Sequence, residues 1–411
     1  MRILSWAFFA LLVMSSHLSS ARAEPVGALH NTFVQLTTQK RLKIVVIGNS
    51  VTHGSPFGGQ THVSFYTALY EWLRAKFPDA TIELKTGIIF AIGPEIQLFR
   101  MEEKVVAEKP DLVLVEFGAA NGAWGDAGRE ITERATEGYI RRLRFLLPRA
   151  DCFMNLGLFR SMMIAYQAGK TPRSASFQHD VARRYNCALA DSGWAIAQRV
   201  MAGEDWNRFM SDGIHPNQKG YAVHSETIVA ELERQYAMFL KEESRTTVNH
   251  PFPASTVHSD PWLFPRLVPA YFAEKTQGFT MGENGRLKYL SAHQVGASGT
   301  FTPGRGKVVG VLMREADGRN SGNLEAKDPD GRWVRLSQQN EPHFTEGDDP
   351  ENRLYRNFFA AYGLPLYLSK VEFRVSASPE TPGAHRTQIV GFLVVEREAS
   401  IPFIREAPNP Q

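Results

Sequence analysis

The sequence predicts a three-layer α/β/α domain followed by an all-β sandwich domain. Up to about residue 245, short apolar runs alternate with stretches of helical periodicity, which is the pattern of parallel strands joined by crossover helices. From about residue 271, short apolar runs are separated by turn dipeptides, which is typical of an antiparallel sandwich. The chain of 411 residues also exceeds what one hydrophobic core usually serves, so two domains are expected.

Residues 1–23 have the pattern of a secretory signal peptide. Arg2 gives a positive start, Ile3 to Met14 form an apolar core, and Ala21-Arg22-Ala23 fits a small-residue cleavage site. The apolar core is too short for a stable membrane anchor, and no later run is long enough to span a bilayer. We therefore expect cleavage after Ala23 and a periplasmic or secreted protein with no stable membrane insertion.

Residues 24–40 show no clear period and are expected as a lead-in to the first domain, residues 41–245. Leu42 to Ile47 form a nearly continuous apolar run rich in β-branched residues, which indicates a strand buried on both faces. The expected strands are 42–47, 81–86, 111–117, 151–159 and 187–191. The expected helices are 64–77, 94–109, 130–147, 177–186 and 218–243. Pro94 suits the first turn of its helix.

The second half of the chain has a different character. Residues 246–270 contain several prolines without a helical period and are expected as a linker or wrapping segment. The sandwich domain is expected at 271–398 and a loosely ordered tail at 399–411. Its expected strands are 308–313, 333–336, 370–375 and 388–395. Asp317-Gly318 and Asp330-Gly331 are hairpin-type dipeptides, and a helix at 352–362 would be a connection.

The net charge bears on whether the protein binds nucleic acid, and the cysteine content on whether it contains a disulfide. The formal charge is +3, and removal of Arg2 and Arg22 with the signal peptide leaves +1, so there is no electrostatic reason to expect a nucleic-acid partner. The basic run 141–144 fits the solvated face of a helix. Cys152 and Cys187 could form a disulfide in an oxidising compartment, but two buried free thiols are the stronger alternative.

Ser50 is the first candidate for chemistry. Gly48, Asn49 and Ser50 follow the first buried strand directly, at the carboxyl end where open α/β sheets place their ligand crevices. Ser50 could be a nucleophile, or only a turn residue or helix cap. Asp212 and His215 lie three residues apart, just before an amphipathic helix, and could supply a carboxylate and a base.

Gly48-Asn49-Ser50 and the Asp-x-x-His-Pro block at 212–216 together resemble the SGNH (GDSL-type) hydrolase family, over about residues 41–244. The resemblance implies a flavodoxin-like fold and a serine esterase without a cofactor. In that reading Ser50 is the nucleophile, His215 the base and Asp212 its orienting carboxylate.

The family also implies three oxyanion donors: the backbone N–H of Ser50, a glycine after the second strand, and an asparagine after the third. Gly93 is the better glycine because it precedes a helix, and Gly87 is the alternative. After the third strand the chain departs from the family pattern of Gly-x-Asn-Asp. Either Asn121 serves one residue late, or Ala120 occupies the position and the side-chain donor is missing.

Two further residues flank these blocks. His53 could line a substrate pocket or be an exposed loop histidine, and Trp124 could stack on a sugar ring or pack in the core. No metal-binding motif stands out, and the acidic run 346–351 fits a solvated loop better than a calcium site.

The function expected is hydrolysis of acyl groups, with O-acetyl foremost, on an extracytoplasmic glycan. The alternatives are an O-acetyltransferase acting on exported polysaccharide, a catalytically degenerate glycan-binding protein, and a lipase or thioesterase. The glycan substrate rests on analogy with members of the family.

Overall fold

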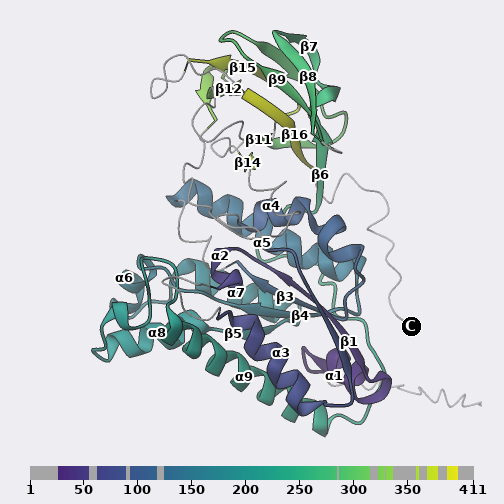
Figure 1. Cartoon of the computed structure of the whole chain (residues 1–411), viewed down its shortest axis with the longest axis vertical. Coiled ribbons are helices and arrows are strands. Elements are labelled where there is room, and N and C mark those ends of the chain that lie inside the picture. The colour runs from purple at the N-terminus through teal and green to yellow at the C-terminus, as the bar shows by residue number, and fades with distance from the viewer. Residues whose placement is uncertain are drawn as a thin grey trace, which may run out of the picture.

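The computed structural model describes residues 26–54, 63–88, 93–117, 125–284, 287–314, 323–328, 330–336, 358–360, 368–377 and 387–396. Figure 1 shows the first domain below and the sandwich above. The expected signal peptide, the dipeptide Asp317-Gly318, the acidic run 346–351 and the tail 399–411 lie outside the described residues.

A five-stranded parallel sheet forms the centre of the first domain, in the order β2-β1-β3-β4-β5. Its strands are β1 (Arg41–Ile47), β2 (Thr81–Thr86), β3 (Leu112–Glu116), β4 (Asp151–Asn155) and β5 (Ala188–Ala190). This strand order is the flavodoxin-like one, so the predicted α/β/α fold is confirmed.

Helices cover both faces of this sheet (Figure 1). They are α1 (His30–Val34), α2 (Ser50–His53), α3 (Phe65–Lys76), α4 (Pro94–Phe99), α5 (Gly125–Leu146), α6 (Met162–Gln167), α7 (Arg173–Arg184), α8 (Ser192–Met201) and α9 (Gln218–Lys241). Leu42, Ile44 and Val46 of β1 share a core with α1, α3 and α9. Val45 and Ile47 share the other core with α4, α5 and α7. Alternation along one strand thus supplies both cores.

Several elements differ from the sequence-based expectation. The predicted helix 94–109 is divided into α4 and a π-helical turn, η2 (Glu102–Val106), and the strand expected to reach residue 159 ends at Asn155. Helix α1, followed by the π-helical turn η1 (Gln35–Gln39), lies in the expected lead-in. All five residues of α1 are buried, the polar His30, Asn31 and Thr32 included, so it has no exposed face and no amphipathic period to detect.

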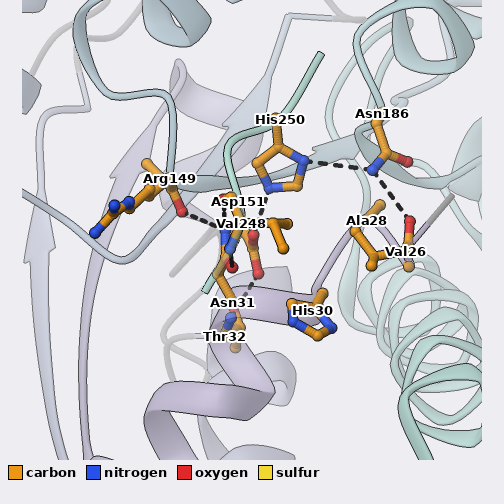
Figure 2. A network of polar contacts seen from close by, with 12 residues as sticks. Val26, Ala28, His30, Asn31, Thr32, Arg149, Asp151, Asn186, Val248 and His250 are labelled. Atoms are coloured by element: carbon orange, nitrogen blue, oxygen red, sulfur yellow. Dashed lines mark hydrogen bonds and ion pairs between the residues drawn. The ribbon is translucent and has the colours of Figure 1, made fainter. Parts of the chain in front are cut away.

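A buried polar network fixes both ends of the first domain at the amino end of β4 (Figure 2). The carboxylate of Asp151 accepts a hydrogen bond from the backbone N–H of Thr32 at 2.6 Å and lies 2.6 Å from Nε2 of His250. The side chain of Asn31 bonds the backbone of Val248 in both directions, at 2.8 and 2.9 Å. The segment after α9 is therefore held against α1, at the end of the sheet opposite Ser50.

The basic run of α5 is not solvated, and that prediction is wrong. Arg141, Arg142 and Arg144 are 2%, 8% and 1% exposed. Arg141 donates to the carbonyl oxygen of Pro253 at 2.6 Å, and Arg144 donates to that of Ala150 at 2.6 Å. Backbone carbonyls compensate the burial of these guanidinium groups, and the bonds from Arg141 to Pro253 and from Arg142 to Leu263 hold the wrapping segment on α5.

Two antiparallel sheets form the predicted β-sandwich, which is confirmed. One sheet has the order β13-β12-β15-β10-β7 and the other β14-β11-β16-β9-β8, with β6 paired to β16. The strands are β6 (Phe264–Pro269), β7 (Glu274–Gln277), β8 (Phe279–Asn284), β9 (Leu287–Ala292), β10 (Ser298–Phe301), β11 (Lys307–Arg314), β12 (Asn323–Lys327), β13 (Trp333–Arg335), β14 (Phe358–Ala360), β15 (Val371–Ser376) and β16 (Thr387–Glu396). The rings of Phe301 and Phe392 stack between the sheets with centroids 4.0 Å apart.

In the sandwich domain, the structure agrees with the predicted hairpin and disagrees with the predicted helix. Asp330-Gly331 lies between the paired strands β12 and β13, with Gly331 at φ 80°, as the hairpin prediction requires. The helix predicted at 352–362 is wrong over 358–360, where the chain is strand β14. The segment expected as a linker ends in β6, which pairs with the second half of β16.

The sandwich packs on the first domain through α4. Ile96 of α4 is buried in a cluster with Tyr289, Leu312, Val390 and Leu393, all from strands of the second sheet. Closely packed apolar side chains oppose movement of α4 relative to the second sheet, so the sandwich helps to hold α4 in place. In the described part of the chain, no helix has the length and apolar character needed to cross a membrane.

The two cysteines are free thiols, and both are buried. Cys152 lies on β4, and Cys187 directly precedes β5, its neighbour in the sheet. The structure therefore contains two buried free thiols, which the sequence analysis favoured over a disulfide.

Candidate active site

A sharp turn at the carboxyl end of β1 presents Ser50. Asn49 caps the short helix α2, and its side chain accepts a hydrogen bond from the N–H of Val51 at 2.9 Å. A Cβ atom on Gly48 would lie 1.8 Å from Oγ1 of Thr52, so only glycine fits at this position. The small residue before the serine is therefore required by the close approach of the turn to its own helix.

Buried groups from two other elements hold this turn. The hydroxyl of Thr52 donates to Oε2 of Glu116, at the end of β3, at 3.3 Å. The hydroxyl of Tyr221, from α9, donates to the carbonyl oxygen of Val51 at 3.0 Å. Burial, and after it the charge of Glu116, raises the pKa of Tyr221 well above its usual value. The phenol therefore remains a neutral donor at every pH at which the protein would work.

His215 and Asp212 reach Ser50 from the loop before α9. Nε2 of His215 lies 2.9 Å from Oγ of Ser50, and Nδ1 lies 2.7 Å from Oδ2 of Asp212. The other carboxylate oxygen, Oδ1, accepts from the backbone N–H groups of Ile214 and His215, each at 2.7 Å. The structure thus brings together the three residues expected to form a catalytic triad.

The electrostatics of this loop fix the tautomer of His215. Partial burial alone raises the pKa of the Asp212 carboxyl, but hydrogen bonds from the His215 ring and from the backbone of His215 and Ile214 outweigh it and bring the pKa to about 2. An ionised carboxylate can only accept, so Nδ1 of His215 carries the proton and Nε2 faces Ser50 with its lone pair. In this arrangement the Ser50 hydroxyl donates to the imidazole.

Residues that the sequence analysis missed keep this loop in place. Nε1 of Trp206 donates to the carbonyl oxygen of Asp212 at 2.8 Å, and the N–H of Arg160 donates to that of Gly213 at 2.9 Å. The backbone N–H of Ser211 closes the loop by donating to the carbonyl oxygen of His215 at 2.8 Å. No local pattern marks these residues, because their bonds go to backbone carbonyls of the loop, which any residue type could offer.

The two candidate oxyanion glycines are distinguished by their backbone hydrogen bonds. The N–H of Gly87 donates to the carbonyl oxygen of Val46 at 2.8 Å, as a continuation of the β1–β2 pairing, so it is not available to a ligand. Gly93 is the N-cap residue of α4, a position whose backbone N–H lies outside the ladder of helical bonds. Gly93 therefore remains the better candidate. Asn121 and Trp124 lie outside the described residues.

His53 ends α2, three residues after Ser50, and is half-buried. Its Nδ1 lies 3.2 Å from the carbonyl oxygen of Gly54. Among the described residues, no group of three or more His, Cys, Asp or Glu side chains could hold a metal ion. The chemistry that this site offers is that of a serine hydroxyl, an imidazole and a carboxylate.

Comparisons with known proteins agree with this geometry. The sequence profile of the GDSL-like Lipase/Acylhydrolase family matches residues 46–223, which include Ser50, Asp212 and His215. A two-domain esterase (CEX) active on acetylated mannans has a similar structure, with a TM-score of 0.65 and 18% identity over 90% of this chain and 96% of that chain. The same esterase co-crystallized with mannopentaose gives a TM-score of 0.64, with 18% identity and the same coverage.

Axe2, an acetylxylan esterase from Geobacillus stearothermophilus, is similar at 16% identity and a TM-score of 0.38, over 46% of this chain and 94% of that chain. No curated protein matches the chain at a significant level. The likeness to CEX shows that both domains share its fold. The resemblance to SGNH hydrolases is confirmed: residues 46–223 match the GDSL-like Lipase/Acylhydrolase family, and the first domain is of the ester hydrolase type that this family describes.

Proposed function

We propose that this protein is a serine esterase that removes O-acetyl groups from an extracytoplasmic glycan through an acyl-enzyme on Ser50. One observation carries the proposal: the hydroxyl of Ser50, the imidazole of His215 and the carboxylate of Asp212 form a continuous hydrogen-bonded relay. That relay is the arrangement by which a serine hydroxyl becomes a nucleophile.

The proposed reaction has two halves. Oγ of Ser50 attacks the acetyl carbonyl carbon while its proton passes to Nε2 of His215. The N–H groups of Ser50 and Gly93 stabilise the resulting oxyanion. His215 then gives the proton to the departing sugar oxygen, which leaves acetyl-Ser50. Water attacks this ester, its proton passes to His215, and acetate leaves as the proton returns to Oγ.

Two arguments support a glycan substrate: the similarity of the two-domain fold to that of a known esterase, and the exposure of the site. The matching two-domain fold belongs to an esterase described as active on acetylated mannans. The site itself lies at the surface, with the side chains of His215 and Asp212 22% and 52% exposed. A surface site admits a polymer chain, whereas long acyl chains are usually bound in an apolar cavity. The N-terminal signal-like segment motivates an extracytoplasmic location.

A screen of ester substrates tests the proposal. Purified wild-type protein would be assayed on 4-nitrophenyl acetate, butyrate and octanoate, and acetate release would be measured from acetylated mannan and acetylated xylan. We expect turnover of acetyl esters, loss of turnover in Ser50→Ala, and acetate release from at least one polysaccharide. Turnover that favours octanoate would indicate a lipase, and turnover unchanged in Ser50→Ala would refute the proposed mechanism.

The same assays separate the alternatives. Acetyl groups that move onto added deacetylated oligosaccharide, in place of acetate release, would indicate an O-acetyltransferase. Binding of the acetylated polysaccharide by wild-type protein and by Ser50→Ala, without turnover by either, would indicate a glycan-binding protein.

A further inference from the structure

One buried side chain links the segments that carry the proposed nucleophile and oxyanion donors. Gln97, in α4, is 2% exposed. Its Nε2 donates to the carbonyl oxygen of Gly48 at 2.8 Å and to that of Gly87 at 3.2 Å. Both partners are carbonyl oxygens, so only the NH₂ end of the amide can face them, and the orientation of the side chain is determined.

These two carbonyls belong to the loops that form the site. Gly48 precedes Ser50 by two residues at the end of β1, and Gly87 follows β2 directly. Gln97 also contacts Gly93 through the backbone, because its N–H donates to the Gly93 carbonyl oxygen at 3.5 Å. A short path of hydrogen bonds therefore runs from the nucleophile turn through Gln97 to the helix terminus that holds Gly93.

The oxygen atom of the Gln97 amide, Oε1, is in a different situation from its Nε2. Oε1 of Gln97 is buried and has no hydrogen-bond partner among the described residues. A buried acceptor without a partner is unfavourable, so the favourable contribution of this amide comes from the two hydrogen bonds that its Nε2 donates. On its far side α4 is packed against the sandwich through Ile96. Helix α4 therefore contacts the sandwich through Ile96 and the nucleophile turn through Gln97.

We propose that Gln97 is a positioning residue that sets the separation between the N–H of Ser50 and the N–H of Gly93. This inference rests on the proposed function. Oxyanion donors act only when they lie within hydrogen-bond distance of the developing charge, and a misplacement of about 1 Å costs about a hundredfold in rate. Gln97 touches no reacting atom, so its effect should appear in kcat and little in KM.

Two substitutions test this positioning role. Gln97→Met keeps the length of the side chain and removes both hydrogen bonds; we expect kcat on 4-nitrophenyl acetate to fall about 10- to 100-fold, with KM within about threefold of wild type. Gln97→Glu cannot donate when ionised but can donate one hydrogen bond when protonated. We therefore expect the ratio of its kcat to that of wild type to rise as the pH falls from 8 to 5, whereas the ratio for Gln97→Met stays flat.

The control is Gln198→Met, an exposed substitution on α8, which should behave as wild type. Circular dichroism at each pH confirms that the variants are folded. A kcat for Gln97→Met within threefold of wild type, or a flat ratio for Gln97→Glu, overturns the inference and leaves the proposed esterase intact. Absence of ester turnover in wild type refutes the proposed function itself, so the two failures are distinct. If Gln97→Met does not fold, the inference is tested by Gln97→Glu alone, through the pH dependence of its kcat relative to that of wild type.

Discussion

Oγ of Ser50 lies 2.9 Å from Nε2 of His215, although the two residues are 165 positions apart in the chain. Ser50 follows β1, and His215 lies in the loop that leads into α9. The two meet because a parallel sheet places the carboxyl ends of its strands, and the loops that follow them, along one edge. Asp212 then completes the relay on the other side of the imidazole.

Loss of the Asp212 carboxylate should disable the relay. In Asp212→Asn the side-chain amide can donate to Nδ1, which favours the tautomer of His215 that cannot accept the Ser50 proton. We expect kcat to fall by about 10⁴-fold with little change in KM. The matched control is Asp205→Asn, because Asp205 caps the neighbouring turn by accepting from Asn207 and does not contact His215. Activity of Asp212→Asn within tenfold of wild type would contradict the relay.

A methyl group at position 48 should distort the nucleophile turn. In Gly48→Ala the new Cβ would meet Oγ1 of Thr52 at 1.8 Å, so the turn or α2 must shift. Overpacking of this kind costs about 1–3 kcal/mol. We expect a lower melting temperature and loss of esterase activity. Gly213→Ala is the stability control, since its Cβ would meet nothing nearer than the Cβ of Arg160 at 3.9 Å. Equal melting temperatures of the two variants would refute this steric reading.

The contact between the sandwich and α4 should contribute to stability. Ile96→Ala removes an apolar side chain that is 5% exposed and packed against Tyr289 and Leu393. We expect the free energy of unfolding to fall by about 2–4 kcal/mol, measured by denaturant titration. The same substitution at Ile164, which is 73% exposed, should change it by less than about 0.5 kcal/mol. If Ile96→Ala has as small an effect as Ile164→Ala, the two domains are not coupled at this contact.

The protein should lose stability as the pH falls below about 6.5. His224 is fully buried, and burial lowers the pKa of its imidazole to about 3. The unfolded chain takes up this proton near pH 6.5, whereas the folded chain excludes it, so the free energy of unfolding falls as the pH falls between these two values. Burial also lowers the pKa of His250 and acts in the same direction.

Denaturant titrations at pH 7, 6, 5 and 4 measure this slope, which is about 1.4 kcal/mol per pH unit for each proton. In His224→Gln the carbonyl oxygen can accept from Asn155, which donates to Nδ1 of His224 at 3.1 Å, and no titrating group remains. We expect the variant to show a slope that is shallower by about one proton. Identical slopes in wild type and variant would show that His224 is protonated in the folded state.

Local sequence was sufficient for the elements whose cause is local. The central strands β1, β3 and β4 could be predicted because a parallel strand buried on both faces must be largely apolar along its length, as in Leu42 to Ile47. Ser50, Asp212 and His215 could be predicted as site residues because short blocks around them carry chemically specific side chains. Helix α1 could not, because it is buried on every side and shows no amphipathic period.

The tertiary structure alone decided which distant groups meet. The sequence by itself determined the five strands of the parallel sheet, the longer amphipathic helices such as α3, α5 and α9, and the residue types of the proposed triad. It did not determine that Arg141 and Arg144 are buried, that Gln97 joins the loops after β1 and β2, or that the N–H of Gly87 is occupied. The physical reason is that these side chains and backbone groups bond carbonyls or carboxylates far away in the chain, and their neighbours are set by the order of the strands.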